Sequence, residues 1–243
     1  MGSGTIVWLT GGSSGIGRAM AESVPWDGAR IVNVSRRPLA GVENVCADLA
    51  TAEGWATIAR SFDRELEGFA GDRAVLVHAA GALAPIGFAG EVDPAAYARC
   101  VVLDSAAPQV VGDAFLRALA RTRARGILLT VSSGASSHVY EGWSAYGAGK
   151  AAVDQWTRTV GAEQARRGGR CRVVAVAPGV VATAMQEEIR ATDETAFPAV
   201  AKFHELYREG RLRTTAEAAR DLWDVALDET LPNGAVIDVR SRG

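Results

Sequence analysis

Short apolar segments alternate along the chain with longer stretches in which apolar residues recur at helical spacing. Most of the short segments are apolar throughout, as expected for strands that are covered on both faces. Strands are predicted at Thr5–Leu9, Arg30–Val34, Ala74–His78, Gly126–Val131, Cys171–Ala175 and Ala235–Val239, with a weaker one around Val45. Helices are predicted near Ile16–Val24, Thr51–Leu66, Pro94–Ala120, Ser144–Arg167 and Thr214–Leu227. Such alternation predicts an α/β fold in which a parallel sheet has helices on both faces.

No long Gly/Ser/Pro linker, composition break or internal repeat divides the chain, so we expect one domain over residues 1–243. One irregular stretch, residues 182–213, lies between the last two predicted strands and contains the Phe197-Pro198 break. Ligands of open α/β sheets bind beyond the carboxyl ends of the strands, so this stretch is interpreted as a lid or substrate wall. The alternative is a surface excursion without a role.

The composition narrows the possible partners. The formal net charge is −2, and no run of Lys or Arg indicates binding to nucleic acid or to an anionic membrane. The three cysteines lack metal-ligand spacing, so no metal is predicted and all three are expected to be buried thiols. No signal peptide is evident, and no apolar run reaches the roughly 20 residues that span a bilayer. A cytoplasmic location is expected.

The first predicted strand ends in a glycine-rich turn. Glycines allow a tight turn and let the backbone approach a pyrophosphate, while the following helix offers free N–H groups to phosphate. The predicted contacts are Gly11, Ser13, Ser14, Gly15, Ile16 and Gly17. The spacing Gly-x-x-x-Gly-x-Gly after Thr10 resembles the short-chain dehydrogenase/reductase family. The resemblance implies a single Rossmann-type doubly wound domain with a mostly parallel seven-stranded sheet.

The end of the second predicted strand bears on which dinucleotide binds. An acid there would accept hydrogen bonds from the ribose of NAD, but this chain has Ser35, Arg36 and Arg37. A guanidinium suits a 2′-phosphate, so NADP(H) is the predicted cofactor.

Further cofactor contacts follow from the family resemblance. Asp48, followed by Leu49, is similar to the family's adenine-binding aspartate, although a plain turn aspartate is the alternative. Ala80 and Gly81 match a family segment whose usual asparagines are replaced here by His78 and Ala79. We expect His78 to be a packed histidine at a strand end. The remaining resemblance is to the family's Pro-Gly motif, which implies contacts from Pro178, Gly179, Val181 and Thr183.

Tyr146 and Lys150 are the predicted chemical centre. Residues four apart share a helix face, and a nearby cation favours the phenolate and lowers the pKa of a tyrosine. Such a tyrosine can donate a proton to a carbonyl oxygen or take one from an alcohol. Ser133 ends a predicted strand 13 positions before Tyr146 (146 − 133 = 13), which matches the family spacing. The resemblance implies that Ser133 holds the substrate oxygen, while Ser132 is structural.

Asp104 departs from the family pattern, which has an asparagine at the similar position. An aspartate cannot donate a hydrogen bond unless it is protonated. Ionised, it would pair with Lys150 through water; protonated, it would serve the usual relay. We expect Asp104 to support the site; the alternative is a plain helix residue.

The substrate side resembles sepiapterin reductases and the related benzil reductases, which implies reduction of a ketone or diketone, aromatic or cyclic. Trp143, Met185 and Phe197 are the predicted apolar pocket residues, although Trp143 could equally be a core residue. Asp238 is similar to the aspartate that anchors the pterin in sepiapterin reductase, and an edge-strand aspartate is the equal alternative.

Three alternative functions differ in how well they agree with the sequence. One is an alcohol dehydrogenase that works in the oxidative direction in secondary metabolism. Another is a non-catalytic NADP-sensing regulator, against which the intact Ser133, Tyr146 and Lys150 argue. A sugar-nucleotide epimerase or dehydratase is disfavoured because those resemble longer chains with another glycine spacing. Relatives usually assemble through long helices, so a homodimer or homotetramer with a small carbonyl or alcohol substrate is expected.

Overall fold

Seven parallel strands form one sheet in the computed structural model, which describes residues 4–241. Residues 1–3 and 242–243 of the predicted domain lie outside the described residues. The strands are β1 (Thr5–Thr10), β2 (Arg30–Ser35), β3 (Glu43–Cys46), β4 (Arg73–His78), β5 (Arg125–Val131), β6 (Cys171–Ala177) and β7 (Val236–Asp238). Their order in the sheet is β3-β2-β1-β4-β5-β6-β7. This doubly wound order confirms the predicted fold class, including the weak strand around Val45.

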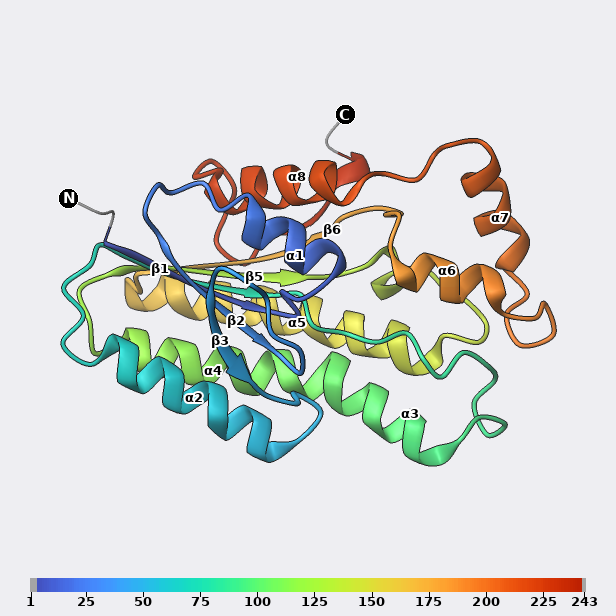
Figure 1. Cartoon of the computed structure of the whole chain (residues 1–243), viewed down its shortest axis with the longest axis horizontal. Helices are drawn as coiled ribbons and strands as arrows, with labels where there is room; N and C mark the ends of the chain where they lie inside the picture. The colour runs from blue at the N-terminus through green and yellow to red at the C-terminus, as the bar shows by residue number, and fades with distance from the viewer. Residues whose placement is uncertain (1–3, 242–243) are drawn as a thin grey trace.

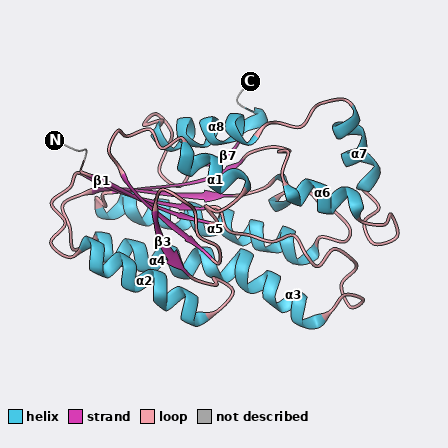
Figure 2. Ribbon diagram, in the orientation of Figure 1, coloured by secondary structure: helices cyan, strands magenta, loops and turns pink. Residues whose placement is uncertain are grey.

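Helices cover both faces of the sheet (Figures 1 and 2). On one face lie α1 (Gly15–Glu22) and α8 (Thr215–Leu227), which contact each other. On the other lie α2 (Ala52–Leu66), α4 (Ala107–Leu119) and α5 (Ser144–Arg167). One apolar core fills each side, because the strands present buried side chains alternately to the two helix layers. Shorter elements complete the chain: α3 (Pro94–Val101), α6 (Ala184–Ala191), α7 (Val200–Arg208) and the 3₁₀ turns Gly134–Ser136 and Val239–Ser241.

Helix starts follow from local capping chemistry. Thr214 accepts a hydrogen bond from the amide of Glu217, whose carboxylate accepts one from the Thr214 amide, a reciprocal capping box that begins α8. Asp93 caps α3 and is followed by Pro94, whose missing N–H costs nothing in the first turn. These side chains therefore fix where the two helices begin.

The predicted helix Pro94–Ala120 is not regular throughout. A π-helical turn, Val102–Ala106, separates α3 from α4 and carries Asp104, which is buried. A π turn shifts the helical register by one residue and is frequently found at functional sites. The turn therefore decides the direction in which Asp104 points.

Residues 182–213 contain two of the short helices, α6 and α7, beside the carboxyl ends of the strands (Figure 1). A parallel bridge between Val181 and Arg213 closes the base of this segment. The Arg213 guanidinium also pairs with Asp221 of α8. The bridge joins the two ends of the segment to each other, and the Arg213 ion pair joins it to α8.

The structure shows which cysteines are buried and whether the described residues include a membrane-spanning helix or a metal site. Cys100 and Cys171 are buried as expected, but Cys46 at the end of β3 is exposed, because this edge strand is covered less than the central ones. None of the helices in the part of the chain that the structure describes is long and apolar enough to cross a membrane. Within residues 4–241, no cluster of His, Cys, Asp and Glu has the make-up of a metal site.

Candidate active site

A cleft of about 600 Å³ lies at the carboxyl ends of the strands. It is lined by all the residues predicted to hold the cofactor, namely Gly11, Ser13, Ser14, Gly15, Ile16, Gly17, Ser35, Arg36, Arg37, Asp48, Leu49, Ala80, Gly81, Tyr146, Lys150, Pro178, Gly179, Val181 and Thr183. Ser133, Trp143 and Met185 line the same cleft. The fold therefore brings into one cavity residues as far apart in sequence as Gly11 and Met185, which are separated by 174 positions (185 − 11 = 174).

The glycine-rich turn sits where β1 and β4 end side by side. Gly11 has φ +69°, and a Cβ there would lie 2.9 Å from the amide nitrogen of Ala80, so only glycine fits. The Thr10 hydroxyl accepts hydrogen bonds of 3.1 Å from the amides of Ala79 and Ala80 and joins the two strand ends. Helix α1 begins after Ser14 with no side-chain cap and no acid in its first turn. Its free N–H groups and dipole therefore suit an anion.

The far end of the cleft is basic. Among the described residues, Arg36 and Arg37 form no ion pair, and both face the cleft after β2. Asp48 lies close by, and both of its carboxylate oxygens accept hydrogen bonds from Arg99, at 2.9 and 2.7 Å. Burial acts to raise the pKa of Asp48, but Arg99 and the Ala50 amide lower it overall, so the carboxylate stays ionised.

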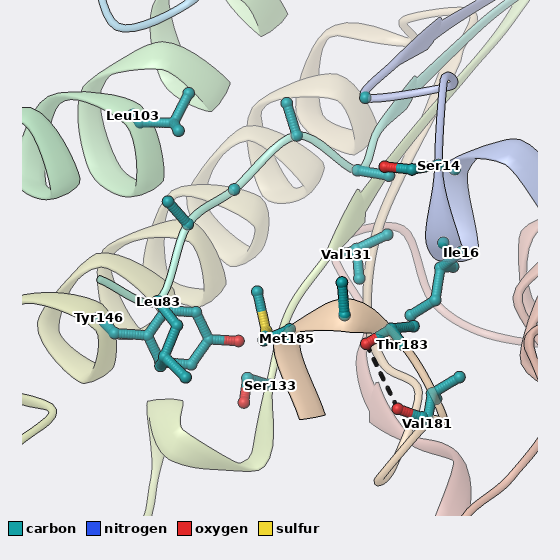
Figure 3. Close-up of a pocket in the computed structure, with 18 of the residues that line it drawn as sticks. Ser14, Ile16, Leu83, Leu103, Val131, Ser133, Tyr146, Val181, Thr183 and Met185 are labelled. Carbon is teal, nitrogen blue, oxygen red and sulfur yellow. Dashed lines mark hydrogen bonds between the residues drawn. The ribbon is translucent and has the colours of Figure 1, made fainter. Parts of the chain in front are cut away.

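Tyr146, in the first turn of α5, points its hydroxyl into the cleft, toward the space bordered by Ser133, Leu83 and Met185 (Figure 3). Its side chain is buried, and burial raises the pKa of its phenol. The Lys150 ammonium and a hydrogen bond with the Ser133 hydroxyl act in the opposite direction without reversing the shift. The sequence-based expectation of a lowered pKa is therefore wrong for this site, and the phenol is protonated at neutral pH.

Lys150 lies one turn further along α5, with its ammonium 5.5 Å from the centre of the Tyr146 ring. Its Nζ donates to the Val131 carbonyl oxygen at 3.1 Å and lies 3.5 Å from Asp104 Oδ1. Burial acts to lower the pKa of Lys150, but the nearby Asp104 carboxylate outweighs it, so the pKa is raised. Burial in turn raises the pKa of Asp104, although the Lys150 charge acts to lower it. The ammonium therefore stays charged beside the phenol.

Asp104 does not line the cleft; it lies behind Lys150 in the π turn. Its Oδ2 accepts hydrogen bonds from the Ala82 amide at 3.3 Å and from the Cys100 thiol at 3.4 Å. A Cβ at Gly81 would stand 2.6 Å from Asp104 Oδ1, so the glycine makes room for the carboxylate. Burial raises the pKa of the Cys100 thiol to about 12, so the thiol remains a donor. Asp104 is a member of a buried polar cluster and not a plain helix residue.

Two other polar residues lie buried at the strand ends. Ser132, next to Ser133, donates a 2.5 Å hydrogen bond to Asp154 of α5 and also lines the cleft. His78 is packed at the end of β4 as expected. Burial, together with the nearby Lys150 charge, lowers its pKa to about 3, so its imidazole is neutral.

An aromatic wall closes the cleft beyond Tyr146. Trp143, Tyr140 and Phe203 line the cleft. Phe197, predicted to line the pocket, instead lies fully buried behind Trp143, with the two rings stacked at 4.5 Å and 9°. This stacking positions the indole of Trp143, which also meets the edge of the Tyr146 ring at 5.8 Å.

Asp238 is also placed differently from the prediction. It does not line the cleft, and its carboxylate accepts hydrogen bonds of 2.9 and 3.1 Å from Nε of Arg240. Arg240 does line the cleft. Its side-chain carbons pass Gly179, and its Nη2 lies next to Gly134, so the guanidinium spans the two loops on either side of the substrate end.

Sequence reasoning missed Arg240, Arg99, Tyr140 and Phe203. Arg240 and Arg99 reach the cleft from elements that are distant in sequence, and no motif marks them. Tyr140 lies six positions before Tyr146 and is held by Lys202, whose ammonium donates to its hydroxyl at 2.8 Å. For Phe203, the only indication in the sequence was that segment 182–213, the predicted substrate wall, contains several aromatic residues.

The fold and this site together define a dinucleotide-dependent oxidoreductase of the Tyr-Lys type. The model of short chain dehydrogenases matches residues 5–194, and the chain belongs to this family, whose members are oxidoreductases that use a nicotinamide cofactor.

Individual relatives cover nearly the whole chain. Benzil reductase ((S)-benzoin forming) of Bacillus subtilis is 29% identical over 242 residues, which cover 96% of this chain and 97% of the relative. The solved structure of the KRED1-Pglu enzyme superposes with a TM-score of 0.82 at 26% identity, covering 96% of this chain and all of the other. A solved structure from Beutenbergia cavernae with bound NADP at low occupancy is 28% identical, with a TM-score of 0.77 over 98% of this chain and 95% of that one.

Proposed function

We propose that this protein is an NADP(H)-dependent reductase that converts a ketone or diketone, aromatic or cyclic, into an alcohol. The observation that carries the proposal is the protonated Tyr146 hydroxyl, which projects into the cleft beside Ser133 and in front of the Lys150 ammonium. This arrangement supplies a proton donor, an anchor for an oxygen atom and a fixed cation at one place. Full-length similarity to benzil reductases supports the choice of substrate.

The cleft residues fit a phosphorylated dinucleotide. The uncapped N-terminus of α1 would hold the pyrophosphate, and the unpaired Arg36 and Arg37 would hold a 2′-phosphate. Asp48 is the residue proposed to meet the adenine, and its orientation is held by Arg99. When bound, the reduced nicotinamide supplies a hydride for the carbonyl carbon. The relative with bound NADP supports the phosphorylated form.

The chain's own residues handle the substrate oxygen. The Ser133 hydroxyl donates a hydrogen bond to the carbonyl oxygen, and Tyr146 transfers its hydroxyl proton to that oxygen as negative charge develops there. The Lys150 ammonium stabilises the phenolate that remains, and Asp104 keeps Lys150 protonated. The phenolate then regains a proton from solvent, so the carbonyl has become a hydroxyl and Tyr146 is restored.

The substrate end favours a flat apolar group with a second oxygen. Trp143, Tyr140, Phe203 and Met185 offer ring faces and a thioether, which pack well on aromatic groups. Arg240 retains donors that its pairing with Asp238 does not use, and these suit an acceptor oxygen such as the second carbonyl of a diketone. Segment 182–213 supplies Met185 and Phe203 and is proposed to act as the substrate wall.

The test is NADPH and NADH oxidation with a panel containing benzil, sepiapterin and small aliphatic ketones. Turnover of benzil with NADPH should fall about 10²–10⁴-fold in Tyr146→Phe, because the general acid is lost. Tyr207→Phe is the matched control, since Tyr207 is exposed on α7 and lies outside the cleft. Tight NADPH binding without turnover of any carbonyl compound would contradict the proposal, and so would a Tyr146→Phe enzyme of normal activity.

A further inference from the structure

Asp238 and Arg240 form a local structure at the carboxyl end of β7, next to the cleft. The sheet register pairs Asp238 with Ala177 of β6, the residue before the Pro178-Gly179 turn that lines the cleft. In the 3₁₀ turn Val239–Ser241 that follows β7, the Asp238 carboxylate accepts a 2.9 Å hydrogen bond from the Arg240 amide. The Asp238 side chain therefore holds the turn that brings Arg240 to the cleft.

The guanidinium of Arg240 lies against the loop that carries Ser133. A Cβ at Gly134, the residue after Ser133, would stand 2.9 Å from Nη2 of Arg240. A Cβ at Gly179 would lie 3.5 and 3.6 Å from Cγ and Cδ of the same side chain. Both glycines line the cleft, as does Arg240 itself. Because Gly134 has no side chain, the guanidinium can lie directly beside the loop of the oxygen-binding serine.

The Arg240 guanidinium is bonded along one edge only. Its Nε donates to both oxygens of Asp238, at 2.9 and 3.1 Å, and its Nη2 donates to the same carboxylate. A guanidinium also carries N–H groups on Nη1 and a second one on Nη2, and these have no acceptor among residues 4–241. The Arg240 side chain is 50% exposed and lines the cleft, so the remaining donors are accessible to a ligand.

Asp238 balances the charge of Arg240. The hydrogen bond from Arg240 lowers the pKa of Asp238, and the same bond raises the pKa of Arg240, so both groups are ionised at neutral pH. A carboxylate in contact with the guanidinium offsets much of the attraction that the guanidinium would exert on an anion. The pair therefore presents hydrogen-bond donors to the cleft with little net positive charge.

We propose that the Asp238–Arg240 pair is a specificity subsite for a neutral oxygen next to the reacting carbonyl, so that vicinal diketones and α-keto esters are preferred over simple ketones and over α-keto acids. This inference rests on the proposed function, since Tyr146 and Ser133 must hold the first oxygen. Arg240 donates to the second oxygen, while the aromatic wall packs on the apolar group. A carboxylate brought to the same place loses its hydration and meets no uncompensated cation, which disfavours the acid.

The first experiment compares two substrates that differ only in the second carbonyl, benzil and deoxybenzoin, in the NADPH-saturated enzyme. In Arg240→Gln the ratio of kcat/KM for benzil to that for deoxybenzoin should fall about tenfold, because a hydrogen bond from a charged donor is lost. Arg211→Gln is the matched control, since Arg211 also pairs with one carboxylate but lies outside the cleft. It should keep the native ratio. An unchanged ratio in Arg240→Gln would overturn the proposal.

The second experiment tests the balance of charge with Asp238→Asn, which leaves Arg240 uncompensated but keeps an oxygen acceptor. Methyl benzoylformate and benzoylformate differ in the charge of the second group. The native chain should prefer the ester, and Asp238→Asn should move the ratio of kcat/KM toward the acid by about tenfold. Glu209→Gln, which removes the partner of Arg211 instead, should not move it. Preference of the native chain for the acid, or the same ratio in Asp238→Asn, would contradict the subsite.

Binding separates this inference from the proposed function. Calorimetric titration of benzil into the NADP⁺-saturated enzyme needs no turnover, and Arg240→Gln should weaken this binding about tenfold while deoxybenzoin is affected less. If benzil binds in this Arg240-dependent way but is not reduced by NADPH, the proposed function fails and the subsite stands. If the ketones are reduced but neither binding nor turnover responds to Arg240, the subsite fails and the proposed function stands.

Discussion

Truncation of Phe197 tests whether this residue supports the substrate wall from behind. Its ring is fully buried, stacks on Trp143 at 4.5 Å and meets Phe203 at 5.6 Å. Removing a fully buried phenyl ring costs the transfer free energy and leaves a cavity, together about 3–5 kcal/mol for Phe197→Ala. In a chain of this size each kcal/mol lowers Tm by about 2–4 °C, so a fall of roughly 6–20 °C is expected.

The same change should separate substrate binding from proton transfer. Without its stacking partner, Trp143 loses a fixed position, so kcat/KM for benzil should fall about tenfold while small aliphatic ketones are affected less. Thermal unfolding and steady-state kinetics with both substrates measure the two effects. Phe88→Ala is the control, because Phe88 is 37% exposed and should cost about 1 kcal/mol or less. Unchanged stability in Phe197→Ala, or equal losses for both ketones, would refute the assignment of Phe197 to the support of Trp143.

Three other changes give distinct outcomes. Asp104→Asn removes the carboxylate whose charge raises the pKa of Lys150. Because burial acts to lower that pKa, the ammonium should lose its proton at lower pH, and the basic limb of the kcat/KM profile should move to lower pH. An unchanged pH profile would mean that the Asp104 charge does not act on Lys150. Replacing Arg36 and Arg37 together with Gln should weaken NADPH about tenfold or more relative to NADH, and equal weakening of both dinucleotides would speak against a 2′-phosphate site. Thr214→Ala removes the capping box of α8 and should cost about 1 kcal/mol in urea unfolding, whereas the neighbouring Thr215→Ala should cost less; equal costs would contradict the assignment of the cap.

The sequence alone determined the fold class and singled out Tyr146 and Lys150 as the candidate catalytic pair. Strands that are covered on both faces must be apolar throughout, so their alternation with helices is visible in the residue pattern. The glycine-rich turn is a local sequence motif. The spacing of Ser133, Tyr146 and Lys150 depends on only one strand and the helix that follows it. These features place the residues at the carboxyl ends of parallel strands, where the structure has them.

Only the tertiary structure decided which distant side chains meet. The π turn directs Asp104 to Lys150, the packing of segment 182–213 sets Phe197 behind Trp143, and the C-terminal turn brings Arg240 to Gly134 and Gly179. The raised pKa of Tyr146 likewise depends on burial in an apolar cluster whose members come from both before and after it in the chain. Such contacts depend on where loops and helix ends lie in space. The local pattern of hydrophobic and polar residues does not determine those positions.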